Sequence, residues 1–245
     1  MCAYLLIAFL LPVLSLALQS VTPDSSIRFI LYGIEAASPS IAAVIVMLKN
    51  GTIKRFFREM FHREHLAKAI VLPVFTAVLT MLGAKLIFCA FFHAGFTFGS
   101  ISIKQFIIIA WALVAEELGW RGYFAPALKE KGLDWRVVPL LVGNVWGVWH
   151  YHYFLTDGIH VPIALFFVSC IIESYLYSFF MDCTGQGLVS AMIYHFMWNF
   201  SVHFFAVDPA DNYGSLYPYI FLVILEGLAM LVLYAARGKQ IPSRH

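Results

Sequence analysis

The chain is divided into long apolar stretches, each of them long enough to cross a lipid bilayer. A transmembrane helix needs about 20 predominantly apolar residues, and eight stretches of this sequence meet that requirement. With 61% hydrophobic and 12% charged residues among 245, the composition excludes a soluble globular domain, a disordered chain and a disulfide-rich secreted domain. We predict an all-α, polytopic transmembrane helix bundle with eight spans at residues 2–20, 27–48, 69–92, 104–127, 137–156, 160–182, 186–206 and 216–236.

The basic residues support this division and predict an orientation. Under the eight-span division twelve Lys and Arg residues share one side, and the opposite loops hold only Arg28 and Lys104. Because short cytoplasmic loops are rich in Lys and Arg, we expect a multi-pass protein of the cell (plasma) membrane with both termini in the cytoplasm. The twelve residues are Lys49, Lys54, Arg55, Arg58, Arg63, Lys68, Lys129, Lys131, Arg136, Arg237, Lys239 and Arg244.

Two segments could be assigned in more than one way. Residues 2–20 lack the basic n-region and the small-residue cleavage site of a signal peptide, so we expect a span there. Residues 49–68 combine basic residues with apolar ones at helical spacing, which predicts a cytoplasmic amphipathic segment on the inner membrane surface rather than a solvated loop. No Ser/Gly/Pro-rich linker or internal repeat divides the chain, so residues 1–245 are expected to form one integral-membrane domain.

Seven charged residues remain inside the predicted spans. Each costs about 2.5–3.5 kcal/mol at the centre of a helix on insertion scales. Such residues are expected to face the bundle interior or a wet cavity, which makes each of them a functional candidate. The sequence assigns no role to Glu226 or Glu35, and it predicts that Glu173 either pairs with Lys85 or forms part of a cavity wall. The full set is Glu35, Lys85, Glu116, Glu117, Arg121, Glu173 and Glu226.

Three of these charges fall in one short segment. Glu117 and Arg121 are four residues apart and share a helix face, so we expect them to form an ion pair. Glu116 points about 100° away, and Arg121 cannot easily neutralise both carboxylates. An unneutralised carboxylate at this depth suits a general base. The same residues also suit a structural ion-pair cluster, and the segment alone does not separate these two interpretations.

Spans five and seven carry further polar residues. His150 lies in span five, and His195 and Asn199 share one face of span seven because they are four residues apart. At 1.5 Å per residue, both His residues and Glu116 lie within the hydrocarbon core. A lone intramembrane His is usually a hydrogen-bonded structural residue, but this combination indicates a polar site on spans four, five and seven. His152 is expected to point elsewhere, near the outer interface.

Together these residues resemble the three signature motifs of a known family. The motifs of the CPBP intramembrane proteases are matched in order and separation by Glu116-Glu117-x-x-x-Arg121, Trp146-x-x-x-His150 and His195-x-x-x-Asn199. This family comprises the type II CAAX prenyl endopeptidases and the bacteriocin-processing or self-immunity proteins, also called the Abi family. Trp146 stands where the second motif usually begins with Phe. The resemblance covers roughly residues 105–205, which would form the catalytic core.

The resemblance implies an intramembrane endopeptidase that hydrolyses a peptide bond with an activated water. Glu116 and His150 would hold and deprotonate that water. His195 and Asn199 would donate hydrogen bonds to the developing oxyanion. The predicted ion pair would support the first motif without taking part in the chemistry.

Metal use stays open at this point. Glu116, His150 and His195 offer three N/O ligands and an open fourth position, as in a catalytic zinc site, but no HExxH sequence strengthens that interpretation. A metal-free mechanism explains the same residues. The implied cofactor is therefore either none or zinc, and the class either a glutamate-type protease or a metalloprotease.

Two other functions use the same residue types. Intramembrane Glu and His residues also serve transporters and proton relays, although no inverted repeat is evident. A non-catalytic immunity or scaffold protein would keep the motifs for packing alone. For an endopeptidase, the expected partners are the lipid bilayer and a peptide or membrane-anchored protein substrate, in CAAX-type C-terminal processing or in a bacteriocin-related role. The net charge of +2 gives no reason to expect nucleic acid.

Overall fold

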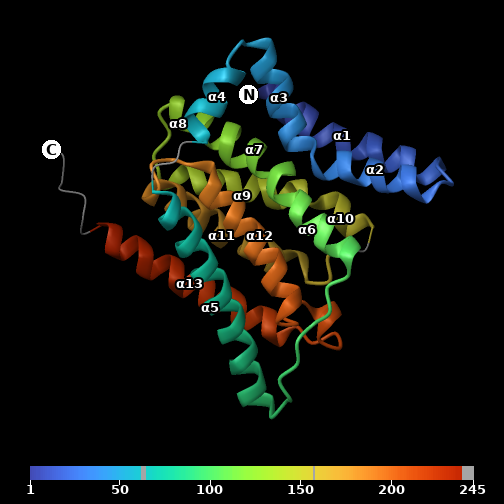
Figure 1. The fold of residues 1–245 in the computed structure, drawn as a ribbon, viewed down its shortest axis with the longest axis vertical. Helices are drawn as coiled ribbons and strands as arrows, with labels where there is room; N and C mark the ends of the chain where they lie inside the picture. Colours follow the sequence, from blue (N-terminus) through green and yellow to red (C-terminus); the bar gives the residue numbers. More distant parts are fainter. Residues whose placement is uncertain (62–64, 157, 239–245) are drawn as a thin grey trace.

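The computed structural model is built from helices (Figure 1). It describes residues 1–61, 65–156 and 158–238, and these ranges contain no β-strand. The prediction of an all-α fold is confirmed. Three basic residues that contribute to the predicted orientation, Arg63, Lys239 and Arg244, lie outside the described residues.

Four helices agree with predicted spans in length and hydropathy. They are α1 (Cys2–Val21), α5 (Leu66–Phe92), α11 (Ile163–Cys183) and α13 (Tyr217–Gly238). The pair α2 (Ser25–Ala36) and α3 (Ser38–Lys49) passes the same test only as one unit, which is bent by 62°. The described part of the chain therefore holds four helices that can cross a membrane, or five with the bent pair. A multi-pass membrane protein is confirmed, whereas the count of eight spans is not.

Helix breaks and short helices account for the difference. Predicted span four is divided into α6 (Ile103–Ala115), α7 (Glu117–Gly119), a π-helical turn η1 (Trp120–Phe124) and α8 (Ala125–Glu130). Span five is divided into α9 (Val137–Trp149) and α10 (Tyr151–Leu155). Span seven is α12 (Leu188–Phe204), followed by a short 3₁₀ turn, η2 (Pro209–Asp211). A 13-residue helix such as α6 or α9 rises only about 20 Å, which is less than the hydrocarbon thickness of about 30 Å.

Helix α12 lies inside the bundle, with α5 and α6 packed against it (Figure 1). Helix α11 packs against both α9 and α13, while α1 and α2 run side by side at one edge of the molecule. Large aromatic side chains from several of these helices fill the interior, and many exposed apolar side chains cover the outer faces of α1, α5 and α13. The buried rings include Tyr4, Trp120, Trp149, Tyr177 and Tyr194.

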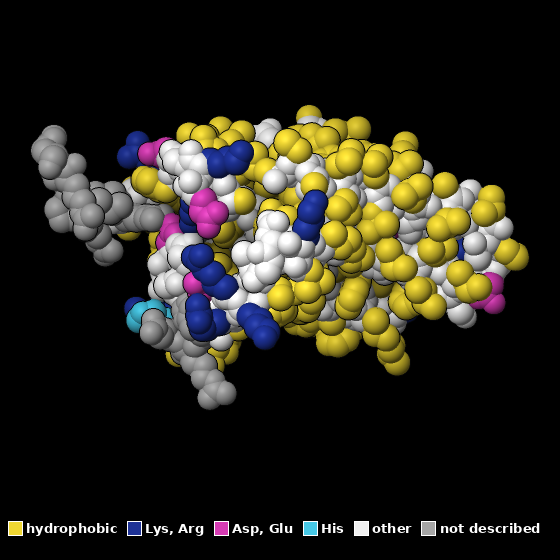
Figure 2. Space-filling view, turned by 90° about the horizontal axis from the view of Figure 1, so that it is seen from above, with side chains coloured by type: hydrophobic (Ala, Val, Ile, Leu, Met, Phe, Trp, Pro, Cys, Tyr) yellow, Lys and Arg dark blue, Asp and Glu magenta, His cyan; other side chains and the backbone are white. Residues whose placement is uncertain are grey.

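Helix α4 (Ile53–Met60) connects α3 to α5 at the basic end of the molecule. Its Phe56 is buried, whereas Lys54, Arg55 and Arg58 are exposed. Figure 2 shows Lys and Arg side chains gathered on this part of the surface, next to a broad apolar area. The predicted segment 49–68 thus contains an amphipathic helix, and its contact with the inner membrane surface stays a prediction.

Gly119 is the position at which α7 approaches α3 most closely, and it gives a test of this packing. A Cβ atom added at Gly119 would lie 2.4 Å from the backbone carbon of Pro39. We expect Gly119→Ala to lower the free energy of unfolding by about 1–3 kcal/mol, because backbone atoms cannot move aside as a flexible side chain can. Thermal unfolding of the detergent-purified protein measures this change.

Gly227 in α13 provides the matched control. A Cβ atom there would meet its nearest neighbour at 3.6 Å, and Ala is favoured over Gly inside a helix. Gly227→Ala should therefore leave the protein as stable or more stable. Equal unfolding temperatures for Gly119→Ala and the wild type would contradict the α3–α7 packing.

Candidate active site

Glu116 lies at the end of α6, and a residue of the second motif holds its side chain. The residue is 4% exposed, and its Oε2 accepts a 2.7 Å hydrogen bond from Nε1 of Trp146 on α9. Its Oε1 lies 3.9 Å from Nε2 of His195 on α12. That separation is too long for a direct hydrogen bond. Oε1 of Glu116 therefore makes no direct hydrogen bond to His195.

Glu117 makes a separate set of contacts, which join α7 to α12. Its Oε1 accepts hydrogen bonds from Nη1 of Arg121 at 2.9 Å and from Nδ1 of His195 at 2.7 Å. All three residues are buried. The ion pair predicted between Glu117 and Arg121 is confirmed, and Glu117 also orients the imidazole of the third motif.

The guanidinium of Arg121 is stacked between two aromatic rings. Its Cζ lies 4.2 Å from the ring centroid of Trp146 and 3.8 Å from that of Tyr177 on α11. A desolvated cation over an aromatic face is stabilised by about 2 kcal/mol. Arg121 belongs to the π-helical turn η1, and such turns are frequent at functional sites. The first motif is thus fixed against both α9 and α11.

His150 lies at the end of α9, where the helix breaks before α10. Its Nδ1 lies 2.8 Å from the backbone carbonyl of Trp146. Because a carbonyl oxygen can only accept a hydrogen bond, Nδ1 carries a proton, and the neutral ring keeps a lone pair on Nε2. A histidine held in this tautomer can accept a proton or a hydrogen bond through its second nitrogen.

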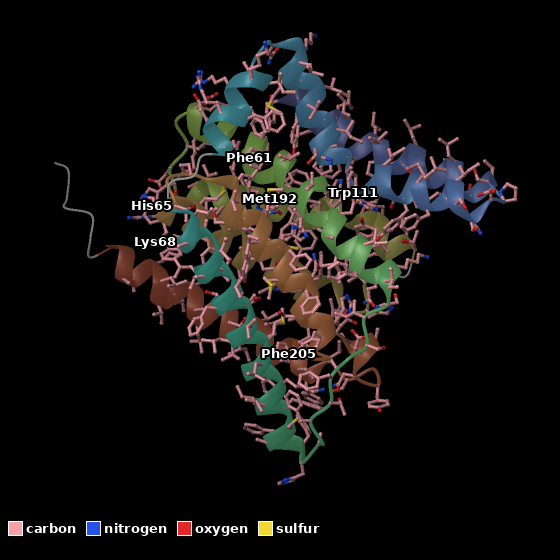
Figure 3. The ribbon with its side chains drawn as sticks, viewed as in Figure 1. Phe61, His65, Lys68, Trp111, Met192 and Phe205 are labelled. Carbon is pink, nitrogen blue, oxygen red and sulfur yellow. The ribbon has the colours of Figure 1, made fainter. Side chains whose placement is uncertain are left out.

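All four predicted catalytic residues line one cavity of about 260 Å³. Glu116 and His150 lie at the ends of their helices, whereas His195 and Asn199 come from the interior of α12. Trp111 on α6 also lines this cavity, and its Nε1 donates a 2.9 Å hydrogen bond to the Gly33 carbonyl of α2 (Figure 3). The structure therefore brings the three motifs to one buried space, and the chemical roles of their residues stay predictions.

The sequence does not predict the contacts of two residues that position the site. For Trp146 it predicts an aromatic side chain, but the indole N–H that bonds Glu116 is specific to Trp. Tyr177 belongs to none of the motifs, and no pattern in α11 indicates that it stacks on Arg121. Both contacts join residues distant in sequence, so only the packing of the helices reveals them.

Glu226 of α13 holds the helix that carries the third motif. Its Oε1 accepts hydrogen bonds from the Tyr194 hydroxyl at 3.1 Å and from Nε1 of Trp198 at 2.8 Å. These two residues immediately precede His195 and Asn199. Because Tyr194 and Trp198 share one face of α12, their bonds to one carboxylate restrict rotation of the helix about its axis.

The other intramembrane charges have structural partners or line the cavity. Lys85 donates to Oδ1 of Asn212 at 3.0 Å and to the Ala206 carbonyl at 3.3 Å. The expected alternative that Glu173 pairs with Lys85 is therefore wrong. Glu173 instead lines the cavity, as the other alternative predicted.

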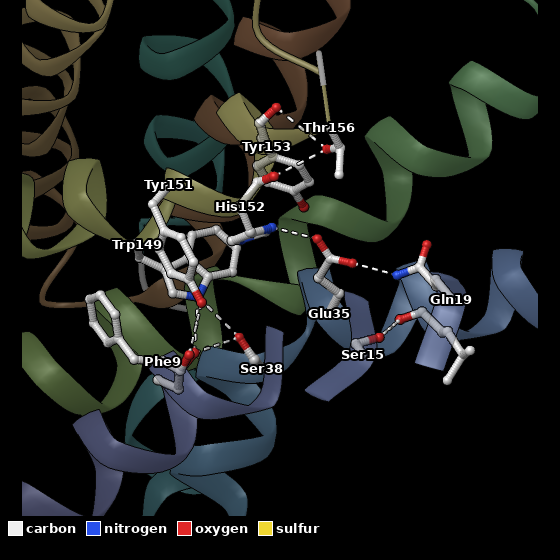
Figure 4. A network of polar contacts seen from close by, with 12 residues as sticks. Phe9, Ser15, Gln19, Glu35, Ser38, Trp149, Tyr151, His152, Tyr153 and Thr156 are labelled. Atoms are coloured by element: carbon white, nitrogen blue, oxygen red, sulfur yellow. Dashed lines mark hydrogen bonds and ion pairs between the residues drawn. The ribbon is translucent and has the colours of Figure 1, made fainter. Parts of the chain in front are cut away.

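Glu35 and His152 form a second buried polar network, next to the cavity (Figure 4). Nδ1 of His152 lies 2.5 Å from Oε1 of Glu35, whose Oε2 accepts a 2.6 Å bond from Gln19. The expectation that His152 lies at the outer interface is wrong, because the residue is fully buried. This hydrogen bond joins α10, directly after His150, to α2.

The arrangement does not provide an obvious metal centre. Among residues 1–61, 65–156 and 158–238, no three His, Cys, Asp or Glu side chains are grouped so that they could hold one metal ion. We therefore derive no chemical step through a metal, and the zinc alternative stays a prediction.

Comparison with known proteins shows which family the chain is similar to. Residues 98–201 match the family model described as type II CAAX prenyl endopeptidase Rce1-like. The match covers less than half of the 245 residues. The CAAX prenyl protease 2 of Methanococcus maripaludis is 24% identical over 125 residues, which cover 47% of this chain and 46% of that protein. The matched part thus spans a little under half the length of this curated relative, and all three motifs lie within residues 98–201, which match the family model.

The stacked Arg121 gives a second test. We expect Arg121→Lys to lower the free energy of unfolding by about 1–2 kcal/mol, because an ammonium group keeps the charge but cannot stack as a plane between two rings. Arg121→Met should cost more, about 3–5 kcal/mol, since it leaves a buried carboxylate without its cation. Chemical or thermal unfolding in detergent measures both values.

The control is an ion pair of the same spacing on the surface. Arg55 and Glu59 are also four residues apart and 2.9 Å from each other, but both side chains are exposed. Arg55→Lys should leave the unfolding temperature unchanged. Equal effects of Lys at residues 55 and 121 would contradict the role assigned to the aromatic stack.

Proposed function

We propose that this protein is an intramembrane endopeptidase that hydrolyses a peptide bond with a water molecule activated by Glu116 and His150. The convergence of Glu116, His150, His195 and Asn199 on one buried cavity carries the proposal. The similarity of residues 98–201 to the type II CAAX prenyl endopeptidase family supports the same reaction class. Burial of Glu116, His150 and His195 also strengthens the electrostatic interactions that such a reaction needs.

The distance between Glu116 and His195 suits a bound water. A single water can lie about 2.8 Å from two polar atoms that are themselves 3.9 Å apart. Glu116, with the Nε2 lone pair of His150, accepts the proton as the water oxygen attacks the scissile carbonyl carbon. The same proton then passes to the leaving nitrogen as the C–N bond breaks, so the reaction gives a carboxylic acid and an amine without an acyl-enzyme.

The third motif stabilises the negative charge that develops on the carbonyl oxygen. Asn199 donates through its side-chain amide. His195 donates through its Nε2 nitrogen, while its Nδ1 nitrogen stays bonded to Glu117. One such donor contributes about 2.7–4 kcal/mol to stabilisation of the transition state. Glu117 and Arg121 position this ring and do not contact the substrate.

We propose a prenylated CAAX-type peptide or another membrane-anchored protein as the substrate class. The family supports this class, and the apolar outer surface suits substrates that arrive through the bilayer. Bacteriocin-related processing or self-immunity is a narrower role within the same chemistry. We place the protein in the cell membrane with both termini in the cytoplasm, on the strength of its basic loops.

Glu116→Gln tests the mechanism directly. The amide cannot take up a proton, so we expect kcat to fall by about 10²–10⁴-fold, with unchanged folding by circular dichroism. Cleavage of a fluorogenic prenylated CAAX peptide in detergent or proteoliposomes measures the rate. Glu59→Gln, an exposed change of the same kind on α4, should keep wild-type activity.

The outcome also separates the competing functions. A folded Glu116→Ala protein that cleaves at the wild-type rate would falsify the mechanism. An immunity phenotype that persists in that variant without cleavage would favour a scaffold. Comparing the membrane peptides of cells that express the wild type or Glu116→Ala would identify natural substrates as those cut only by the wild type.

Metal removal tests the cofactor. We expect the purified protein to keep its activity after exhaustive dialysis against chelator, because the proposed steps use only side chains of the chain itself. Activity is measured with the same peptide before and after dialysis. A loss of activity that added zinc restores would show that the metal-free mechanism is wrong.

A further inference from the structure

Glu173 is a buried carboxyl group in the cavity wall that none of the motifs includes. It is 4% exposed and lies on α11. It lines the cavity together with Phe166, Cys170 and Tyr177 of the same helix, so one face of α11 forms this part of the wall. Within the described ranges, no hydrogen bond or ion pair to another side chain or to the backbone occupies its carboxyl group.

The contacts of α11 place Glu173 along the cavity. The Phe166 ring lies 4.9 Å from the His150 ring, and the Tyr177 ring lies 6.2 Å from the His195 ring. Glu173 is between these two positions on the same helix, about 6 Å along the axis from Tyr177. It therefore lies on α11 between the positions that contact His150 and His195.

The other acidic groups are already engaged. Glu116 accepts the indole N–H of Trp146 and is assigned to the water. Asp208, at another part of the cavity, accepts the backbone N–H of Ala210. Glu226 accepts from Tyr194 and Trp198. Glu173 is thus the buried acidic group of the cavity whose oxygens have no hydrogen bond to the described protein.

A peptide inside the membrane needs hydrogen-bond acceptors for its backbone N–H groups. Each backbone N–H that lacks an acceptor in a water-poor environment costs several kcal/mol, and a carboxyl oxygen accepts such a bond whether the group is ionised or protonated. We infer that Glu173 is a substrate-binding residue, which accepts a hydrogen bond from a backbone N–H of the peptide near the scissile bond. This inference rests on the proposed peptidase function.

Kinetics with two variants test this role. Glu173→Leu removes the acceptor at similar size, and Glu173→Gln keeps one acceptor oxygen. We expect Leu to raise KM for the prenylated CAAX peptide about tenfold or more with little change in kcat, because a bond present in both ground and transition state alters binding alone. Gln should raise KM by less. An unchanged KM in a folded Glu173→Leu protein would overturn the inference.

A substrate series identifies the donor. Peptides in which one backbone amide at a time is replaced by an ester lack a single N–H. At one position, the ester should weaken peptide binding to the wild type about as much as Glu173→Leu weakens binding of the unmodified peptide. The same ester should not weaken binding to Glu173→Leu any further. Equal losses of affinity in the wild type and in Glu173→Leu at every ester position would contradict a hydrogen bond to a peptide backbone N–H. Binding that depends on a basic side chain of the peptide instead would also contradict it.

Other outcomes separate the substrate-binding role of Glu173 from a structural role and from the proposed peptidase function. A lower unfolding temperature of Glu173→Leu with unchanged KM would assign Glu173 a structural role beside Glu226. If Leu does not fold, Glu173→Met provides the same comparison. Failure of the wild type to cleave any peptide would instead overturn the proposed function, and binding of the ester series to the uncleaving protein would still test the Glu173 contact.

Discussion

The buried carboxylate of Glu117 is the contact on which the site depends. One oxygen accepts from both Arg121 and His195, and so joins the first motif to the third. A charge placed in a low-dielectric interior is tolerated only when a counter-charge and hydrogen bonds compensate for lost hydration. Arg121 supplies the charge, and the rings of Trp146 and Tyr177 cover the guanidinium. The orientation of the His195 imidazole follows from this cluster.

Helix breaks determine where the other reactive groups point. Helix α6 ends before Glu116, and α9 ends before His150. Both residues lie at a break between two helices, and both side chains line the same cavity. The third motif lies in the unbroken helix α12, whose rotation Glu226 restricts. The site is therefore formed by three segments: the helix breaks at Glu116 and His150, and the helix α12, which Glu226 holds.

Much of this arrangement could be predicted from the sequence. The ion pair of Glu117 with Arg121 follows from their spacing of four residues, and the shared face of His195 and Asn199 follows from the same rule. The span count could not be predicted as well. Hydropathy sums the apolar character of a stretch, and a single break such as the one at His150 hardly changes that sum. Eight apolar stretches therefore do not require eight straight spans.

Contacts between distant residues were beyond the reach of the sequence. Hydropathy and spacing mark Glu35, Glu173 and Glu226 as buried charges, but they name no partner for them. His152 illustrates the point, since its position suggests an interface, whereas its ring is buried against Glu35. Such pairings depend on which helix faces which, and that is decided only when all the apolar surfaces pack together.

The sequence by itself determined an all-α membrane protein and the charged side chains buried in it, because these follow from hydropathy and from the 3.6-residue helical repeat. The three motifs were assigned by their resemblance to those of a known family. The tertiary structure decided that Glu116 is held by Trp146, that His195 is held by Glu117, and that Glu173 lines the same cavity. Hydrogen bonds of this kind depend on distances of a few ångströms between helices. Local sequence rules do not encode those distances.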